Sequence, residues 1–483
     1  MKSLKSIFQN IKQLQWIGSE DVAIEALEFD SRAVQPQSCF CALKGELSDG
    51  HSYIDAAVAK GAVAVLCEQL PQSLCDGVTY IVVEDSHKAM GQAAAAFYDN
   101  PSASLQLVGI TGTNGKTTTA TLLYDLFRSL GYSVGLISTV TYCIDDEHYE
   151  STHTTPDAIR LQAMIRQMVD RGCQYCFMEV SSHSVVQHRI AGLQFAGALF
   201  SNITHDHLDY HHTFAEYIKA KKGLFDSLPK GAFAVTNIDD RNGEVMLQNC
   251  KASHHSYSLR SMADFRAKII EMHLDSMLLK LDGQEIWVGS TGRFNAYNML
   301  AIYSVARLLE IPQSEILVAM SSLRAVCGRF ETIALSNGAT AIIDYAHTPD
   351  ALRSVILTIE EIKSSDQQLI VVCGCGGDRD RTKRPEMAKI ATSHASLSIF
   401  TSDNPRTEPA QQILQEMVEG VTDPTARHIT IEDRREAIRT AILFAKAGDV
   451  VLVAGKGHEK YQIIGHEKFH FSDHEVVQEM IKK

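Results

Sequence analysis

The sequence predicts an α/β protein of three domains, each with a mostly parallel β-sheet covered by helices. Its 483 residues are too many for one hydrophobic core, and at about 150 residues per domain they suggest about three domains. Short apolar runs alternate with helical patterns along the chain, which is typical of βα repeats. A turn at Asn100 and a change of pattern near Glu331 predict domains at 1–103, 104–330 and 331–483.

The first domain is expected to be a small α/β unit. Apolar runs indicate its strands, and the segments SYIDAAVAKG and KAMGQAAAAFYDN between them carry apolar residues at helical spacing. The expected strands lie at 25–32, 39–45, 61–68 and 79–85.

The second domain opens with an expected strand at 105–110, then a Gly-rich loop and a helix that begins near Lys116. Later apolar runs recur at βα intervals, which predicts a mostly parallel sheet. The stretch from about 252 to 290, with its alternation around 277–289, is expected to be an antiparallel hairpin, and an amphipathic helix from Phe294 follows it. The other expected strands of this domain lie at 135–139, 173–183, 197–204 and 231–237.

The third domain is expected to be a second doubly wound unit with its own loops at the strand ends. Helical patterns such as DALRSVILTIEEI and QQILQEMVEGV separate its apolar runs. The four expected strands lie at 340–346, 369–375, 397–403 and 449–457.

Composition limits the classes of function. The formal charge of 45 − 58 = −13 argues against a protein that binds nucleic acid or an anionic membrane, because such a protein needs a basic face. No apolar run reaches the roughly 18 residues that span a bilayer, and the N-terminus lacks a signal-peptide core. The 11 cysteines are scattered, so we expect free thiols in a reducing cytoplasm, with Cys173 and Cys176 packed in the core.

The strongest local signal is VGITGTNGKTTTA at 108–120, where a strand enters a Gly-rich turn and then a helix. Backbone N–H groups of such a turn, with the helix N-terminus, form a cradle for phosphates. Lys116 is expected to reach the β- and γ-phosphates of ATP, and the Thr117 hydroxyl to hold Mg²⁺. The strict pattern GxxxxGK[ST] fails because Gly109 lies six residues before Gly115, which argues mildly against an ordinary kinase or GTPase. The alternative is a chance match in a surface turn.

Two other strand ends carry metal-ligand chemistry. Glu179 ends an expected strand, and SNITHDHLDYHH at 201–212 follows another. The carboxyl ends of parallel strands meet at one edge of a sheet, so we expect both near the phosphate loop. Mg²⁺ prefers hard oxygen ligands such as carboxylates. The alternative for 201–212 is a solvated His-rich loop.

A series of motifs resembles the Mur ligase family. In chain order they are GTNGKTT, TTP at 154–156, EVSSH, NITHDHLDYH, FNAYNMLA, GRFE, DYAHTPDAL, GGDRDRTKRP, DNPR and GKGHE. The resemblance covers residues 25 to 460 and is greatest to the members that add diaminopimelate. The chain departs from the family pattern at Gln37-Ser38, where Pro-Gly is usual, and at Cys327, where Pro is common.

The resemblance implies an N-terminal UDP-binding α/β domain, a central P-loop ATPase domain and a C-terminal Rossmann-like domain. It implies an ATP- and Mg²⁺-dependent, ADP-forming ligase that joins meso-2,6-diaminopimelate to the D-glutamate of UDP-N-acetylmuramoyl-L-alanyl-D-glutamate. It further implies a reaction through an acyl phosphate in peptidoglycan precursor synthesis, with catalysis largely by positioning and charge neutralisation. A monomer is expected, with no nucleic-acid partner and no membrane insertion.

The resemblance also assigns roles to residues. Lys221 matches a lysine that CO₂ carbamylates to N6-carboxylysine, which makes it an anionic oxygen ligand, and Lys219 or Lys222 are the alternative positions. The catalytic set is Lys116, Glu179, His207 and Lys221, and the metal set is Thr117, Glu179, His207 and carbamylated Lys221. The ATP set is Gly112, Thr113, Asn114, Gly115, Lys116, Thr117, Thr118, Asn295, Arg329 and Asp344, with Asn298 beside Asn295. The UDP-muramoyl-dipeptide set is Ser31, His51 within Asp49-Gly50-His51, Thr154, Thr155, Ser181, Gln187 and Arg189.

The prediction of the amino acid depends on Asp403-Asn404-Pro405-Arg406, which follows an expected strand. Pro405 fixes the local φ, and a guanidinium can bind the second carboxylate of diaminopimelate, which lysine lacks, through two parallel hydrogen bonds. The resemblance adds Arg379 for another carboxylate oxygen and Glu459 for the distal ammonium. The complete diaminopimelate set is Arg379, Asp403, Asn404, Pro405, Arg406, Gly455 and Glu459.

Other functions are less favoured. A Mur ligase that adds L-lysine remains the nearest alternative. A folylpolyglutamate synthase would lack the UDP-domain signature at 29–53. The segment GCGGDRDR could belong to an oxidoreductase, but it is not GxGxxG and the expected acidic residue does not follow it. A non-catalytic nucleotide-binding regulator is the last alternative, and ADP release that depends on both substrates would exclude it.

Overall fold

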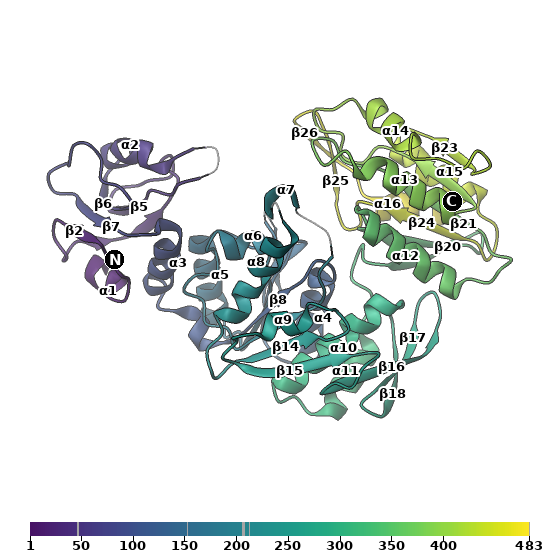
Figure 1. The fold of residues 1–483 in the computed structure, drawn as a ribbon, viewed down its shortest axis with the longest axis horizontal. Coiled ribbons are helices and arrows are strands. Elements are labelled where there is room, and N and C mark those ends of the chain that lie inside the picture. The colour runs from purple at the N-terminus through teal and green to yellow at the C-terminus, as the bar shows by residue number, and fades with distance from the viewer. Residues whose placement is uncertain (46–47, 152, 205–207, 212, 483) are drawn as a thin grey trace. The chain divides into compact units, whose positions relative to one another are not determined.

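The structure is a computed structural model that describes residues 1–45, 48–151, 153–204, 208–211 and 213–482. These residues form two compact units, Met1–Ser256 and Tyr257–Lys483 (Figure 1). None of the helices in the described ranges is long and apolar enough to cross a membrane. All 11 cysteines are free, and Cys173 and Cys176 are buried as expected.

The first unit begins with a five-stranded sheet in the order β2-β7-β6-β5-β4. Strands β4 to β7 are parallel, and β2 pairs antiparallel with β7. Side chains alternate along β5: Cys39 and Cys41 pack with α1 and α3, whereas Phe40 packs with α2 on the opposite face. The elements are β1 Lys2–Ser3, α1 Leu4–Phe8, β2 Gln15–Ile17, β3 Ala23–Ile24, β4 Ala26–Glu28, β5 Ser38–Cys41, the 3₁₀ helix Gly50–Tyr53, α2 Ile54–Ala59, β6 Ala62–Cys67, β7 Thr79–Val82, α3 Ser86–Phe97 and the 3₁₀ helix Pro101–Ser104.

The rest of the first unit is a larger sheet whose strands β9, β12, β8, β13 and β14 lie side by side in that order. Phe177 of β12 packs against Phe127 of α4, with ring centroids 5.0 Å apart, while the next residue, Met178, joins the core beneath α5 and α8. Helices therefore cover both faces. The elements are β8 Gln106–Thr111, α4 Lys116–Ser129, β9 Val134–Ile137, β10 Thr141–Ile144, β11 Glu147–Glu150, α5 Ala158–Asp170, β12 Tyr175–Glu179, α6 Ser182–Val186, β13 Gly197–Phe200, α7 Leu208–His211, α8 Phe214–Asp226, β14 Phe233–Asn237, α9 Gly243–Leu247 and β15 Ser253–Ser258.

Register brings the ends of three strands of this sheet level with one another. Glu179, the last residue of β12, pairs with Ile110 of β8, and Phe200 at the end of β13 pairs with Thr111. The expected parallel sheet is confirmed, and its carboxyl edge carries the Gly-rich loop. The antiparallel hairpin β10–β11 was not expected, because its exposed outer strand lacks apolar residues apart from Tyr149.

The second unit begins with an antiparallel meander, β16-β17-β18. The antiparallel hairpin expected between about 252 and 290 is confirmed as β17–β18, and β16, within the same stretch, adds a third strand. Helix α10 packs on β16 and α11 on β18. The elements are β16 Phe265–Met272, β17 Met277–Leu281, β18 Gln284–Val288, α10 Arg293–Leu308 and α11 Gln313–Ser322.

A six-stranded sheet in the order β19-β20-β24-β21-β22-β23 completes the second unit. Its five consecutive strands from β20 to β23 are parallel, and β19 pairs antiparallel with β20. Helices α12, α13 and α14 cover one face, and α15 and α16 cover the other. The elements are β19 Glu331–Ala334, β20 Thr340–Asp344, α12 Pro349–Ile362, β21 Leu369–Cys373, α13 Lys383–His394, β22 Leu397–Phe400, α14 Ala410–Val418, β23 His428–Thr430, α15 Arg434–Phe444, β24 Val450–Ala454, β25 Tyr461–Ile464, β26 Glu467–His470 and α16 Asp473–Ile481.

The four strands expected here are confirmed as β20, β21, β22 and β24, and the doubly wound prediction holds. Strand β21 lies between β24 and β22, so the loops that follow these three strands start side by side at one sheet edge. Those loops carry the GGDRD, DNPR and GKGHE motifs. The short strands β19 and β23 and the hairpin β25–β26 were not expected.

Candidate active site

The Gly-rich loop joins β8 to α4 as expected, and its glycines are required by its geometry. Gly112 has a φ of 151°, and a Cβ on it would lie 1.9 Å from Ser201 Oγ. Gly115 precedes the first residue of α4, Lys116, in a left-handed conformation with a φ of 86°. The loop therefore passes closely over the end of β13 and points the α4 N-terminus to the sheet edge.

The segment after β13 braces this loop. The Thr113 N–H donates to the Asn202 carbonyl at 2.8 Å, and the Asn114 N–H donates to Asn202 Oδ1 at 2.9 Å. In return, the Ser201 hydroxyl and the Asn202 amide donate to the Asn114 carbonyl at 2.7 and 3.0 Å. Ser201 and Asn202 are thus site residues that the sequence interpretation did not single out within 201–212.

Two lysines converge on one carbonyl of the loop. Lys116 Nζ donates to the carbonyls of Gly112 and Thr113 at 3.0 and 2.9 Å. Lys221 of α8, only 1% exposed, donates to the same Gly112 carbonyl at 2.7 Å and lies 4.5 Å from the Tyr217 ring centroid. Two ammonium groups that donate to one carbonyl repel each other, so an anionic ligand such as a phosphate would be stabilised beside them.

Glu179 is fully buried at the same sheet edge. Its Oε1 accepts the Thr139 N–H at 2.7 Å, and its Oε2 lies 3.2 Å from the Thr139 hydroxyl. That hydroxyl also lies 3.0 Å from Thr154 Oγ1. The carboxylate is thus oriented by Thr139, a residue that the sequence did not point to, and it is linked to the expected substrate residue Thr154.

Residues expected to bind the muramoyl-dipeptide gather around the end of β12. The Thr155 hydroxyl donates to the Glu179 carbonyl at 2.8 Å and accepts the Ser181 N–H at 3.3 Å. Arg189 donates to the Thr155 carbonyl at 2.7 Å and, through Nε and Nη2, to Gln187 Oε1 at 3.0 and 2.7 Å. Burial lowers the pKa of Arg189 from its ordinary value. The structure therefore joins Thr154, Thr155, Ser181, Gln187 and Arg189 into one polar cluster.

Ser31 and His51 belong to the other sheet of this unit, where they follow the adjacent parallel strands β4 and β5. His51 Nε2 accepts the Glu68 N–H at 2.9 Å, so its other nitrogen, 2.6 Å from Asp49 Oδ1, carries the proton. The imidazole thus connects the 49–51 turn to the residue that follows β6. The role of these two residues in binding UDP stays a prediction.

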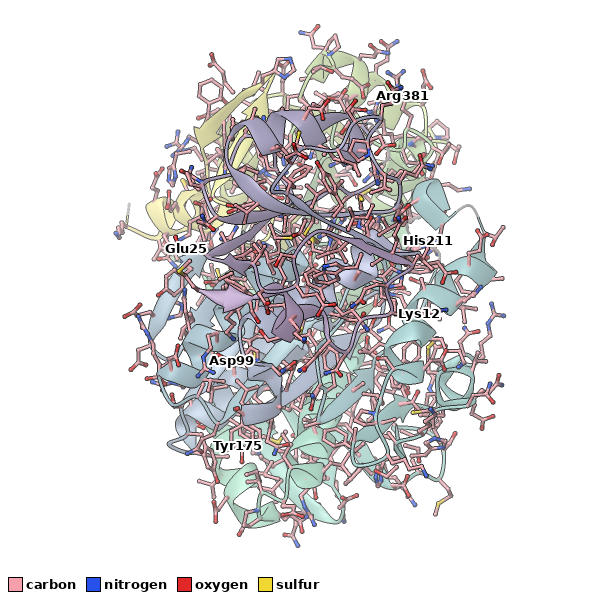
Figure 2. The ribbon with its side chains drawn as sticks, turned by 90° about the vertical axis from the view of Figure 1, so that its left-hand side faces the viewer. Lys12, Glu25, Asp99, Tyr175, His211 and Arg381 are labelled. Carbon is pink, nitrogen blue, oxygen red and sulfur yellow. The ribbon has the colours of Figure 1, made fainter. Side chains whose placement is uncertain are left out.

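The predicted metal ligand His207 lies outside the described residues. Within the described ranges, no group of three His, Cys, Asp or Glu side chains could hold a metal ion. The nearby His211, labelled in Figure 2, places Nε2 2.8 Å from the Ser182 hydroxyl. The described hard-oxygen donors, Thr117 and Glu179, suit Mg²⁺ but would need further oxygens to complete its coordination.

In the second unit, Asn295 and Asn298 form a buried pair at the start of α10. Asn295 Nδ2 donates to the Thr291 carbonyl at 2.9 Å, and Asn298 Nδ2 donates to Asn295 Oδ1 at 3.0 Å. Both side chains lie on one face of the helix, as their spacing predicts.

Arg329 lies in the turn just before β19, and Asp344, the last residue of β20, lies beside that turn. The Arg329 guanidinium lies 4.5 Å from the Tyr345 ring centroid. The Asp344 carboxylate accepts the N–H groups of Phe330 and Ala346, each at 2.7 Å, and burial raises its pKa. Asp344 therefore fixes the backbone beside Arg329, and the binding of ATP by these two residues stays a prediction.

Arg406 is held through its main chain and its guanidinium. Its N–H donates to the Ile463 carbonyl at 3.1 Å, and its own carbonyl accepts the Gly465 N–H at 2.7 Å. The backbone adopts a left-handed φ of 51°. Arg406 Nη1 donates to the Gly377 carbonyl at 2.7 Å, which links the DNPR loop to the GGDRD loop. The β25–β26 hairpin and the neighbouring loop thus fix the direction of this side chain.

Asn404 and Glu459 share a buried polar cluster with a lysine. Asn404 Nδ2 donates to Glu459 Oε2 at 3.0 Å, and Asn404 Oδ1 accepts the Ile463 N–H at 3.0 Å and Lys456 Nζ at 3.1 Å. Lys456 also donates to Glu459 Oε2 at 2.9 Å. The sequence interpretation included Gly455 and Glu459 of GKGHE but missed Lys456 between them.

The remaining diaminopimelate candidates adjoin this cluster. A Cβ on Gly455, whose φ is 117°, would lie 2.9 Å from Asp403 Oδ2, so these two residues touch. Arg379 is exposed on the loop after β21 and donates to the Asp378 carbonyl at 3.1 Å. Gly376 has both Arg406 and Arg379 beside it.

Three family models match the chain. Mur ligase family, catalytic domain, matches residues 23–98; Mur ligase middle domain matches 110–306; and Mur ligase, glutamate ligase domain, matches 328–457. A protein of Bacteroides fragilis named UDP-N-acetylmuramoyl-L-alanyl-D-glutamate--2,6-diaminopimelate ligase is 52% identical over 478 residues, which are 99% of each chain. A protein of the same name from Geobacillus kaustophilus is 42% identical over 96% of each chain.

Solved structures agree with these relatives. A structure titled UDP-N-acetylmuramoyl-L-alanyl-D-glutamate--2,6-diaminopimelate ligase has a TM-score of 0.72 at 32% identity and covers 100% of this chain and 99% of its own. A MurF ligase of Thermotoga maritima in complex with ADP has a TM-score of 0.63 at 19% identity, covers 96% of this chain and 98% of its own, and supports the fold alone.

Proposed function

Because the chain belongs to the Mur ligase family, we propose that it joins meso-2,6-diaminopimelate to the D-glutamate of UDP-N-acetylmuramoyl-L-alanyl-D-glutamate. ATP phosphorylates the substrate carboxylate, the amine attacks the acyl phosphate, and ADP and phosphate are released. The observation that carries this proposal is identity of 50 to 52% over nearly the full chain to five relatives named for that reaction. The product is a peptidoglycan precursor.

The phosphate loop supports the nucleotide part of the proposal. Gly112 to Thr118 would cradle the phosphates with backbone N–H groups, and Lys116 would exchange its two carbonyl partners for phosphate oxygens. A flexible amine that rests on two carbonyls can make this exchange without moving the backbone. Asn295, Arg329 and Asp344 are further proposed contacts to ATP.

Mg²⁺ would be held by Thr117, Glu179 and a carbamate on Lys221, with His207 as a further ligand, and would neutralise phosphate charge when bound. The burial of Lys221 beside Lys116 supports carbamylation, because CO₂ would replace one of two adjacent cations with an anion. Lys219 and Lys222 are less suited, since Lys219 is exposed and Lys222 already pairs with Asp226 on the same helix.

Arg406 favours diaminopimelate over L-lysine. The guanidinium is fixed at the loop edge, and a second carboxylate on the amino acid would complete its hydrogen bonds. With L-lysine, the guanidinium would be left without this partner. Arg379, Asp403, Gly455 and Glu459 are the proposed surrounding contacts, with Glu459 for the distal ammonium.

We further propose that the protein acts as a monomer in the cytoplasm, where ATP and a UDP-linked substrate are available. Eleven free thiols are consistent with a reducing compartment. Sedimentation with and without substrates would test the monomer.

An amine screen tests the reaction. Purified protein with ATP, Mg²⁺ and the UDP-muramoyl-dipeptide would be offered meso-diaminopimelate, L-lysine and L-glutamate, with phosphate release and product mass as readouts. We expect turnover with diaminopimelate and little with L-lysine. Preference for L-lysine, or phosphate release without added amine, would contradict the proposal.

A further inference from the structure

Lys456 is a buried cation within the proposed amino-acid site. It follows β24, has no exposed surface, and lies 5.5 Å from the Tyr461 ring centroid. Removing an ammonium from water is costly unless polar groups satisfy it. Its partners are Asn404 Oδ1 and Glu459 Oε2, both in the set predicted to contact the substrate. Lys456 therefore holds Asn404 and Glu459 in place, although it was not itself predicted to contact the substrate.

The position of Lys456 determines which way the Asn404 amide faces. A lysine ammonium only donates, so the Asn404 atom beside it must be the carbonyl oxygen. The Ile463 N–H, 3.0 Å from the same oxygen, requires the same assignment. The Asn404 NH₂ group is consequently turned to Glu459.

The same arrangement orients the Glu459 carboxylate. Its Oε2 receives two donors, Asn404 Nδ2 at 3.0 Å and Lys456 Nζ at 2.9 Å. Within the described ranges, no hydrogen bond to Oε1 is found, and the side chain is 14% exposed. One oxygen is thus anchored, and the other remains able to accept an ammonium from a ligand.

We propose that Lys456 is a positioning residue for recognition of the distal ammonium of the incoming amino acid, because it fixes the Asn404 amide and anchors one oxygen of Glu459. The inference rests on the proposed function, and it adds a specificity element to it. Lys456 itself does not touch the substrate. Without its ammonium, Glu459 Oε2 would keep only the Asn404 amide as a donor, and Asn404 Oδ1 only the Ile463 N–H, so both side chains would be held less firmly.

The test compares two amino acids on two variants. 2-Aminopimelate has the chain and both carboxylates of diaminopimelate but lacks the distal amine, so it does not use Glu459. Lys456→Met keeps the length and the apolar stem of the side chain and removes the charge. Lys460→Met is the matched control, because Lys460 is an exposed lysine four residues away.

In Lys456→Met we expect kcat/KM for diaminopimelate to fall about 10-fold to 100-fold, the usual effect of losing hydrogen bonds to a charged group. The kcat/KM for 2-aminopimelate should fall much less, so the ratio of kcat/KM for diaminopimelate to that for 2-aminopimelate should fall by about 10-fold. The KM for ATP and the Lys460→Met enzyme should stay close to wild type.

Equal falls with both amino acids would overturn the inference, because they would indicate a general structural defect. An unchanged preference would do the same. As a second comparison, Lys456→Met combined with Glu459→Gln, which removes both charges of the buried pair, is compared with Glu459→Gln alone. A large further loss of preference in the double variant would refute the coupling. A wild-type enzyme that does not use diaminopimelate would instead refute the proposed function.

Discussion

Arg406→Ala is expected to raise the KM for diaminopimelate strongly. Among the described residues, the Arg406 guanidinium contacts two main-chain carbonyls, both through Nη1: Gly377 at 2.7 Å and Asn404 at 3.5 Å. The Nε–Nη2 edge can therefore face a carboxylate. Loss of a charge-assisted pair costs about 2 to 4 kcal/mol at a partly buried site. At 1.4 kcal/mol per tenfold, this is about 30-fold to 700-fold in KM.

The control separates the guanidinium from the backbone. Arg406 has a φ of 51°, where alanine is strained by about 1 kcal/mol and glycine is not. Arg406→Gly therefore removes the same charge without that strain. We expect both variants to raise the KM for diaminopimelate alike, with Arg406→Gly the more heat-stable of the two.

The assay measures phosphate release against diaminopimelate concentration at saturating ATP and UDP-substrate. The KM values for ATP and for the UDP-substrate should change less than about threefold, because these ligands have other proposed contacts. The reasoning fails if Arg406→Ala retains a KM for diaminopimelate within about threefold of wild type, or if Arg406→Gly restores the wild-type value.

Three further outcomes are expected. Lys221→Ala should be nearly inactive and partly rescued by short-chain carboxylic acids; an unmodified ammonium in active, bicarbonate-treated enzyme, seen by intact mass, would count against carbamylation. Asp473→Asn should lower the unfolding free energy by about 3 to 5 kcal/mol in denaturant titrations, because it leaves the fully buried Arg434 without its carboxylate. The Arg384 guanidinium holds the pKa of Glu408 at about 2, below its ordinary 4.5. The contribution of the Glu408 carboxylate to stability is therefore complete above about pH 5 and is lost as the pH falls towards 2. The unfolding free energy of Glu408→Gln should therefore fall less than that of the wild type between pH 7 and pH 3. An equal fall in both proteins would contradict this.

The parts of the site that the sequence predicted are those with local signals. The strand, the glycines and the helix around Gly112 to Lys116 are contiguous, so propensity and spacing were sufficient to place them. Glu179 was predicted because it ends an apolar run. Arg406 was predicted from Pro405 and its place after a strand.

The parts that were missed depend on tertiary contacts. Asn202 can contact the phosphate loop only because β13 lies beside β8, and the order of strands in a sheet cannot be predicted from the local sequence pattern. Lys456 is a lysine in a Gly-rich turn, which usually indicates solvent exposure, and only the packing of Tyr461 and Glu459 around it shows burial. The hairpin β25–β26 is polar on its exposed strand, so periodicity gave no signal.

The hairpin β25–β26 holds Arg406 through main-chain atoms, with a bridge between Arg406 and Ile464 and hydrogen bonds to Ile463 and Gly465. Main-chain pairing is largely indifferent to side-chain identity. The outer strand Glu467–His470 can therefore accumulate neutral substitutions while the guanidinium keeps its direction. With such a scaffold, the exposed strand can change in sequence while the guanidinium that we propose to select the amino acid stays in place.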